Sequence, residues 1–254
     1  MYGWRAKIGL ITPMSETAEH AFHTHAPAGV TFSSVKIPTD TLGIEKAAYI
    51  NEHLKTAVEA YRHYDADLIV SGSTSASFLN GSASLNEIDE LSRTICGKPG
   101  LSAGTAVLEA LDALQIKRPA ILTPYPDDLN EIVKNFFSGR GFAVSGITGM
   151  DMSQFTQNGC SFESASEHFL YQYAAHMELH DADALFISSM ELTTMDLIHD
   201  LETDLKIPVV TSQSAVFWSA LRHCRIGDER ADIGRLGFLR GTVIDQSGID
   251  SKER

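Results

Sequence analysis

The stretch DADLIVSGS (residues 65–73) returns 116 residues later as DADALFISS (181–189). Two further matches flank this pair: GLITP (9–13) returns as AILTP (120–124), and KPGLSAGTAV (98–107) returns as IPVVTSQSAV (207–216). The three matches keep their order along the chain, with offsets of 111, 116 and 109 residues. Ordered matches at nearly constant spacing indicate an internal repeat. The chain is therefore predicted to contain two similar halves, in which Ser73 and Ser189 are equivalent.

Segments of strand and helix character alternate along the chain. The strand-like segments are short apolar runs: 7–13, 31–38, 66–72, 118–124, 142–150, 182–189 and 208–212. The helix-like segments carry apolar residues at helical spacing: 43–64, 85–94, 100–116, 127–141, 161–178, 194–205 and 214–224. Ser102 and Ser161 are predicted to cap two of these helices. Such alternation predicts an α/β fold, in which helices cover both faces of a parallel sheet.

The repeat also predicts how the chain divides. Residues 1–115 plus 215–254 are expected to form the first α/β half, and residues 116–214 the second, related by a pseudo-two-fold axis. Folds of this kind bind ligands beyond the carboxyl ends of their strands. Two facing halves would therefore share one cleft as the active site, and Ser73 and Ser189 would approach a substrate from opposite sides.

Charge and cysteine usage narrow the classes of partner. A net charge of −13 argues against nucleic acid or an anionic membrane as the main partner. Cys96, Cys160 and Cys224 lie far apart and lack metal-ligand spacing, so neither a disulfide framework nor a zinc site is expected. The start does not resemble a signal peptide, and no apolar run is long enough for a membrane helix, so a cytoplasmic location is expected. Assembly into a homo-oligomer stays open.

Several stretches together carry a resemblance to a known family: KIGLITP (7–13), GSTSASF (72–78), TPYPDDLNE (123–131), GITGM (146–150) and ALFISSMELTTMDLIHDLETDLKIPVVTSQSAVFW (184–218). The chain resembles the cofactor-independent aspartate/glutamate racemase superfamily. Within it, the chain is most similar to arylmalonate decarboxylase, with maleate cis-trans isomerase and the ectoine-utilisation proteins as near relatives. The resemblance covers nearly the whole chain. It implies two α/β halves with the site between them, and neither a cofactor nor a metal.

The catalytic positions depart from the pattern of this superfamily. Its racemases and maleate isomerases use two cysteines, one from each half, and its decarboxylase keeps only the second one as a proton donor. The resemblance places Ser73 and Ser189 at these two catalytic positions. A serine hydroxyl is a far weaker acid than a thiol, whose pKa is about 8.5. A mechanism that depends on two thiolates is therefore excluded.

The carboxylate site is better preserved. In the decarboxylase, loop hydroxyls, a tyrosine and backbone amides bind a carboxylate and stabilise the enediolate. The matching groups here are Thr74, Ser75 and Tyr125, together with the backbone of Ser189 and Met190. Neutral donors of this kind stabilise negative charge that develops on a substrate oxygen. The alternatives are that Thr74 and Ser75 only cap the next segment and that Tyr125 only packs within a turn.

Two residues beside the first strand complete the predicted substrate site. Pro13 ends that strand, and Glu16 takes the place of a substrate-binding asparagine of maleate isomerase. Glu16 and Glu191 are candidate bases if burial raises their pKa, and solvated loop acids otherwise. Cys160 is a weak catalytic candidate. The histidines of HAFHTH (20–25) are expected at the surface or an interface and not at a metal.

These observations predict a cofactor-independent enzyme that acts at the α-carbon of a small mono- or dicarboxylate. Its intermediate would resemble an enediolate, and its reaction would be a decarboxylation, a racemisation or a cis-trans isomerisation. One alternative is a carboxylate-binding protein without turnover. Another is a Cys→Ser form of a maleate isomerase or racemase, trapped by the loss of both thiols.

Overall fold

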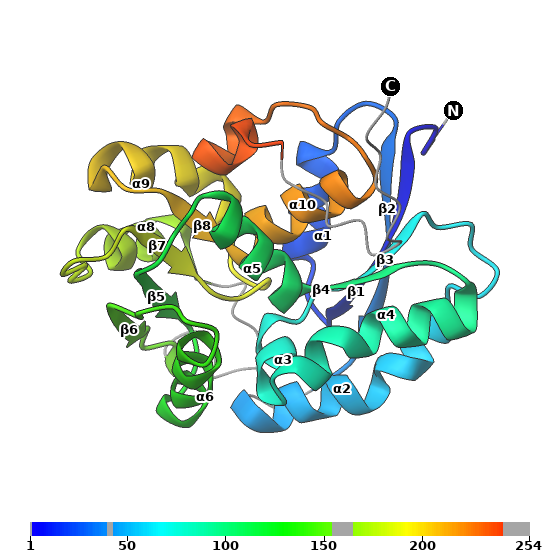
Figure 1. The fold of residues 1–254 in the computed structure, drawn as a ribbon, viewed down its shortest axis with the longest axis horizontal. Coiled ribbons are helices and arrows are strands. Elements are labelled where there is room, and N and C mark those ends of the chain that lie inside the picture. Colours follow the sequence, from blue (N-terminus) through cyan, green and yellow to red (C-terminus); the bar gives the residue numbers. More distant parts are fainter. Residues whose placement is uncertain (1, 40–42, 154–164, 241–254) are drawn as a thin grey trace.

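The computed structural model describes residues 2–39, 43–153 and 165–240, which form two four-stranded parallel sheets (Figure 1). The first sheet has the order β2-β1-β3-β4 and contains β1 (Ala6–Pro13), β2 (Val30–Ile37), β3 (Leu68–Ser71) and β4 (Gly100–Ser102). The second has the order β6-β5-β7-β8 and contains β5 (Pro119–Thr123), β6 (Gly146–Gly149), β7 (Ala184–Ile187) and β8 (Val209–Thr211). The predicted α/β class is confirmed, and the strand order repeats.

Helices flank both sheets. Those that follow strands of the first sheet are α1 (Thr17–His25), α2 (Gly43–Glu59), α3 (Thr74–Leu79), α4 (Ser82–Cys96) and α5 (Ala103–Ala113). Those that follow strands of the second are α6 (Asp127–Ser138), α8 (Glu167–Ala175), the 3-10 turn η1 (Met195–Leu197), α9 (Ile198–Leu205), α10 (Ser212–His223) and η2 (Ala231–Phe238). Figure 1 shows α5 and α10 side by side between the two sheets.

The sequence repeat is also a repeat of contacts. Asp67 and Asp183 occupy the same place in the two DAD motifs. The carboxylate of Asp67 accepts a hydrogen bond of 2.8 Å from the amide of Lys7, at the start of β1. The carboxylate of Asp183 accepts one of 2.8 Å from the amide of Arg118, just before β5. Each half therefore uses its repeated aspartate to fix its third strand beside its first.

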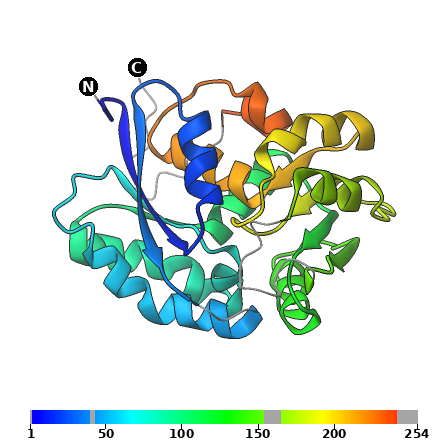
Figure 2. The same cartoon turned by 180° about the vertical axis from the view of Figure 1, so that it is seen from behind.

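The end of the described chain packs on elements of the first half. The ring of Phe217 in α10 lies 5.5 Å from that of Phe22 and 5.9 Å from that of Phe32, measured between centroids. Figure 2, seen from behind, shows α1 in front of α10. Arg5 also forms a salt bridge of 2.6 Å with Asp228. The predicted division of the chain into two halves, 1–115 plus 215–254 and 116–214, stays a prediction. The contacts of Phe217 and Asp228 with the first half are in line with it.

Several element boundaries differ from the predicted ones. The apolar pattern predicts neither α1 nor α3, because both are shorter than the window of about 11–18 residues over which helical periodicity is recognised. Ser102 caps α5, as expected, by accepting a hydrogen bond from the amide of Thr105. The helix predicted over 161–178 begins only at Glu167, where Ser166 is the cap, and Ser161 lies outside the described residues. In the described ranges, no helix is long and apolar enough to cross a membrane.

Candidate functional site

Ser73 and Ser189 lie at equivalent ends of two strands. The amide of Gly72 donates to a carbonyl of β1 at 2.7 Å, and the amide of Ser188 donates to a carbonyl of β5 at 2.8 Å. The following residues, Ser73 and Ser189, are both buried. The backbones of the two halves therefore make matching hydrogen bonds as far as Gly72 and Ser188, the residues before the two serines.

The backbone diverges at the serines themselves. Ser73 is extended, with φ −108° and ψ 104°, and directly precedes α3. Ser189 has a φ of 132°, in the region that favours glycine. A conformation of this kind costs about 1–3 kcal/mol and persists only where its surroundings enforce it. The second loop is thus the strained one.

Two neighbouring side chains hold Ser189 in place. Its amide donates a hydrogen bond of 3.0 Å to Oγ of Ser212, the first residue of α10. Its own Oγ accepts a hydrogen bond of 3.1 Å from the amide of Glu191. Gln213 donates through Nε2 to the carbonyl of Met190 at 3.0 Å. The binding of a carboxylate by the Ser189 amide stays a prediction; in this structure the amide is bonded to Ser212.

Tyr125 joins hydroxyls from both halves. Its ring is buried, and Oγ of Ser188 donates to its hydroxyl at 3.2 Å. Burial raises the pKa of Tyr125 far above its usual value, against the opposing effect of hydrogen bonds with Ser188, Ser189 and Ser75. The phenol is therefore a neutral donor in contact with the loop after β3 and the loop after β7.

A buried network fixes the turn that carries Tyr125. Asn130 donates through Nδ2 to the carbonyl of Tyr125 at 2.9 Å, and its Oδ1 accepts from Oγ1 of Thr123 at 2.5 Å. A Cβ at Gly149 would lie 2.8 Å from Nδ2 of Asn130 and 3.0 Å from the carbonyl oxygen of Tyr125. Glycine is therefore required at this position for the close approach. Sequence reasoning missed Asn130, although it lies within the TPYPDDLNE stretch.

Two threonines at the strand ends keep unused hydroxyls. Thr74 and Thr12 are buried, and neither Oγ1 has a hydrogen-bond partner among the described residues. A buried hydroxyl without a partner costs free energy and is uncommon in native proteins. Thr74 is one of the predicted substrate-binding residues, while Thr12 was not predicted. A Cβ at Gly72 would lie 3.1 Å from Cγ2 of Thr12, so the end of β1 and the first loop are in close contact.

A buried ion pair lies near the phenol of Tyr125. Nζ of Lys46, in the first turn of α2, is 2.7 and 2.8 Å from the two carboxylate oxygens of Glu191. The two side chains are 7% and 9% exposed. The sequence predicts Glu191 as a candidate base but gives no sign of its partner. Lys46 falls on an ordinary helical pattern, 145 residues away from Glu191. The reading of Glu191 as a solvated loop acid is corrected, because the residue is buried and paired.

The other predicted residues differ in burial. Pro13 and Met190 are buried, while Glu16 is exposed at the start of α1. Their roles in binding substrate stay predictions. Burial raises the pKa of the Cys224 thiol to about 12, so this cysteine is not a ready nucleophile. Cys160 lies outside the described residues. The HAFHTH histidines lie on or beside α1, and no metal-binding group of three or more His, Cys, Asp or Glu occurs in the described ranges.

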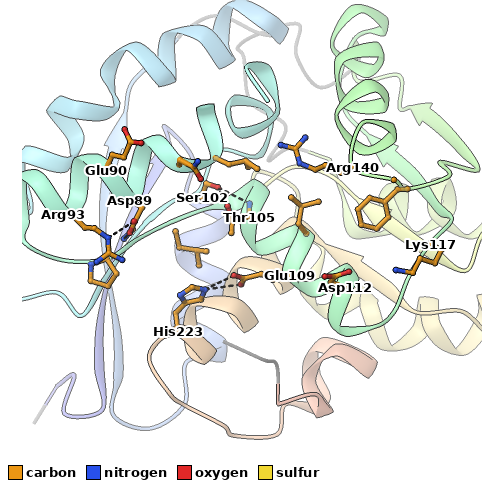
Figure 3. Close-up of a pocket in the computed structure, with 18 residues that line it drawn as sticks. Asp89, Glu90, Arg93, Ser102, Thr105, Glu109, Asp112, Lys117, Arg140 and His223 are labelled. Atoms are coloured by element: carbon orange, nitrogen blue, oxygen red, sulfur yellow. Dashed lines mark hydrogen bonds and ion pairs between the residues drawn. The ribbon is translucent and has the colours of Figure 1, made fainter. Parts of the chain in front are cut away.

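One cavity of about 770 Å³ lies elsewhere (Figure 3). Its labelled side chains come mainly from α4, α5 and α10, and the carboxylate of Glu109 binds Nε2 of His223 there at 3.0 Å. Arg93 is likewise paired with Asp89 at 2.7 Å. None of the predicted site residues lines this cavity, and four of its titratable side chains pair with one another. The chemistry predicted from sequence therefore has no counterpart in it.

Comparison with known proteins relates most of the chain to one family. The sequence profile of the arylmalonate decarboxylase family matches residues 8–237. Arylmalonate decarboxylase of Bordetella bronchiseptica is 32% identical over 169 residues, which cover 64% of this chain and 68% of that protein. Maleate isomerase of Nocardia farcinica is 25% identical over 241 residues, covering 91% and 94%.

Solved structures agree with these sequence matches. A crystal structure of arylmalonate decarboxylase superposes with a TM-score of 0.72 at 25% identity, covering 92% of this chain and 99% of that one. A variant of the Nocardia farcinica maleate cis-trans isomerase, with a covalently bound succinylcysteine intermediate, superposes with a TM-score of 0.83 at 22% identity, covering 91% and 98%. The resemblance noted from sequence is confirmed, and the chain belongs to the arylmalonate decarboxylase family.

Proposed function

We propose that this protein is a cofactor-independent enzyme that acts at the α-carbon of a small carboxylate, with decarboxylation of a substituted malonate as its reaction. One observation carries the proposal: hydroxyl groups from both halves meet at the buried phenol of Tyr125. The relatives support it, because they are a decarboxylase and an isomerase of small carboxylates. The hydroxyls of Thr74 and Ser75 are assigned to the same substrate carboxylate.

The neutral donors act on charge that develops during the reaction. When the bond between the α-carbon and one carboxylate breaks, carbon dioxide leaves and the electron pair stays as an enediolate on the other carboxylate. The phenol of Tyr125 and the hydroxyls of Thr74 and Ser75 would hydrogen-bond these oxygens. Preorganised donors in a site with little water stabilise such charge strongly, since they need no reorganisation. A proton then adds to the α-carbon.

Of the three reactions, decarboxylation requires the fewest catalytic groups from the protein, because it needs neither a base nor a nucleophile. Racemisation needs a base that removes a proton from the α-carbon, and the family's cis-trans isomerisation uses a nucleophilic thiol. The two strand-end positions hold serines, which are weak in both roles. Glu191 is paired with Lys46, and Glu16 is exposed. Loss of carbon dioxide supplies the electron pair without any base.

Ser189 is the proposed source of the final proton. Its Oγ accepts from the amide of Glu191, so the hydroxyl proton is directed toward a different acceptor. A carbanion-like enediolate is a strong base, so even a weak acid can protonate it. Water can return the proton to the serine after each turnover. Ser73, on the other loop, has no step in this scheme beyond shaping the first loop.

The test is turnover in D₂O with phenylmalonate, followed by carbon dioxide release and by NMR of the product. We expect carbon dioxide and a product with one deuterium at the α-carbon. The T74V variant removes one donor and is expected to lose about 10²-fold in kcat. T31V is the matched control, because Thr31 also has a buried Oγ1 without a partner among the described residues and lies near the opposite end of its strand.

Each other result has a definite meaning. Equal losses in T74V and T31V would assign the effect to folding and would contradict a role for Thr74 in binding. Binding of phenylmalonate without carbon dioxide or deuterium incorporation would replace the enzyme proposal with the carboxylate-binding alternative. Turnover of maleate that appears only after both serines are changed to cysteine would instead identify a trapped isomerase.

A further inference from the structure

The ion pair of Lys46 and Glu191 connects elements that are far apart in the chain. Lys46 lies on α2, which follows the second strand of the first sheet, and Glu191 lies after β7 of the second sheet. A Cβ at Gly43, the first residue of α2, would come within 3.3 Å of the ring of Pro126, next to Tyr125. Figure 1 shows this end of α2 beside α6. The first turn of α2 therefore reaches the second half where the hydroxyl cluster lies.

Burial of this ion pair costs desolvation free energy, so the pair is a poor way to stabilise the fold alone. Two charges must leave water, and well-packed apolar residues in their place are often as stable or more so. Loss of one partner is different, since it leaves an uncompensated buried charge. Both carboxylate oxygens of Glu191 bind the single ammonium group, at 2.7 and 2.8 Å. Such a contact fixes the position of the Glu191 side chain and neutralises its charge.

Both consequences act on the proposed site. The backbone amide of Glu191 donates to Oγ of Ser189, so an anchored Glu191 also anchors the strained loop. The carboxylate is close enough to Tyr125 that its negative charge adds to burial in raising the pKa of that phenol. An unneutralised charge at Glu191 would therefore repel a carboxylate bound at Tyr125.

We propose that Lys46 and Glu191 form a positioning latch. The ion pair holds the Ser189 loop in its strained conformation, and it neutralises the negative charge of Glu191 beside Tyr125, where the substrate carboxylate is proposed to bind. This inference rests on the proposed function for its effect on the substrate, while the anchoring of the loop does not depend on it. Neither residue is assigned a contact with substrate or a step in proton transfer. The two act through Ser189 and Tyr125.

A latch of this kind predicts effects of opposite sign for its two members. K46M leaves a buried carboxylate and is expected to weaken phenylmalonate binding by about tenfold or more. E191Q leaves a buried ammonium, so binding should stay equal or become tighter, while kcat falls because Ser189 has lost its anchor. K46M/E191Q removes both charges and should bind more tightly than K46M alone. K46R keeps the charge and should retain most of the binding.

Two measurements on the full chain test this. Calorimetric titration with phenylmalonate reports binding without any need for turnover. Hydrogen exchange of the Ser189 and Glu191 amides reports the loop without any ligand, and should accelerate at least about tenfold in K46M and in E191Q. K98M is the matched control, because Lys98 pairs with Asp65 at 3.0 Å on the surface. It should change neither measurement.

The outcomes separate the latch from the proposed function. If wild type neither binds nor converts phenylmalonate, the proposed function fails, while faster exchange in K46M and E191Q still supports anchoring of the loop. If wild type is active but K46M and E191Q behave like K98M, the latch is wrong. It is also wrong if K46M and E191Q shift binding in the same direction, since a merely structural pair would do that. Should K46M not fold, E191Q is compared with K46M/E191Q: E191Q keeps an unpaired ammonium and should bind phenylmalonate at least as tightly as the double variant, and weaker binding by E191Q would contradict the latch.

Discussion

In the first half the chain runs from β3 through an extended Ser73 directly into α3, whereas in the second half it runs from β7 through Ser189 at a φ of 132° and reaches only the short η1. Thr74, the first residue of α3, keeps a buried hydroxyl without a partner among the described residues. The second loop is tied by Ser212 and Gln213. The two copies of the repeat therefore continue differently: one leads to an unused donor at the start of α3, and the other leads to a loop that is held under strain.

This difference suggests a division of work between the halves. An unused buried donor is suited to receive a substrate oxygen, because the substrate then satisfies it. A strained and tied loop is suited to hold one group in a fixed direction, such as the hydroxyl of Ser189, the proposed proton donor. Repeats that began as copies can thus bind a substrate on one side and deliver a proton from the other. The following predictions test that asymmetry.

The largest effect is expected where the two loops meet. Y125F removes the phenol that contacts Ser75 of one loop and Ser188 and Ser189 of the other, and should lower kcat with phenylmalonate by about 10²–10³-fold. Y61F is the control, since within the described part of the chain the Tyr61 hydroxyl bonds to backbone groups of β1 and β2 and to no site residue. An activity of Y125F within about threefold of wild type would mean that the loops do not share a substrate.

Cysteine substitutions should affect the loops unequally. S189C places a thiol with a pKa near 8.5 at the proposed proton donor and should raise the rate of decarboxylation, by about 10²-fold if protonation limits turnover. S73C changes a residue without a step in the scheme and should change the rate by about threefold or less. Steady-state rates of carbon dioxide release measure both. A larger gain from S73C would reverse the assignment of the two loops.

Alkaline destabilisation should draw on both halves. Burial raises the pKa of Tyr61, in the first half, and of Tyr125, in the second. The pKa of each tyrosine is higher in the folded protein than in the unfolded chain, where it is about 10. The contribution of each neutral tyrosine to the free energy of unfolding is therefore complete below pH 10 and is lost as the pH rises further. At pH 11 each tyrosine should lower the unfolding free energy by roughly 1 kcal/mol. Urea unfolding of Y61F and Y125F between pH 8 and 11 should show a correspondingly shallower decline.

The smallest expected effects have opposite signs in the two loops. S189G relieves the positive φ, so it should be more stable than S189A by about 1 kcal/mol. S73G should be less stable than S73A by about 0.5–1 kcal/mol, because Ser73 is extended and glycine only adds freedom to the unfolded chain. Urea unfolding at neutral pH measures all four variants. Equal differences at both positions would contradict strain at Ser189.

The part of the site that sequence reasoning could reach lies close to the repeat. Ser73 and Ser189 follow from matched strands, and Thr74, Ser75 and Tyr125 follow from stretches that resemble the family. The residues that hold them could not be found in the same way. Asn130, Gln213 and Ser212 are buried polar residues on helices, and nothing in an amphipathic pattern shows which carbonyl or amide they contact.

The α/β class, the repeat, the strand ends and the serines at both repeated strand ends could all be read from the sequence. Local periodicity and matched spacing suffice for these, because strand and helix periods are properties of neighbouring residues. Only the tertiary structure decided that Ser189 is strained while Ser73 is not, and that Lys46 meets Glu191. These depend on packing between segments 145 residues apart, where a side chain's partner is set by the whole fold.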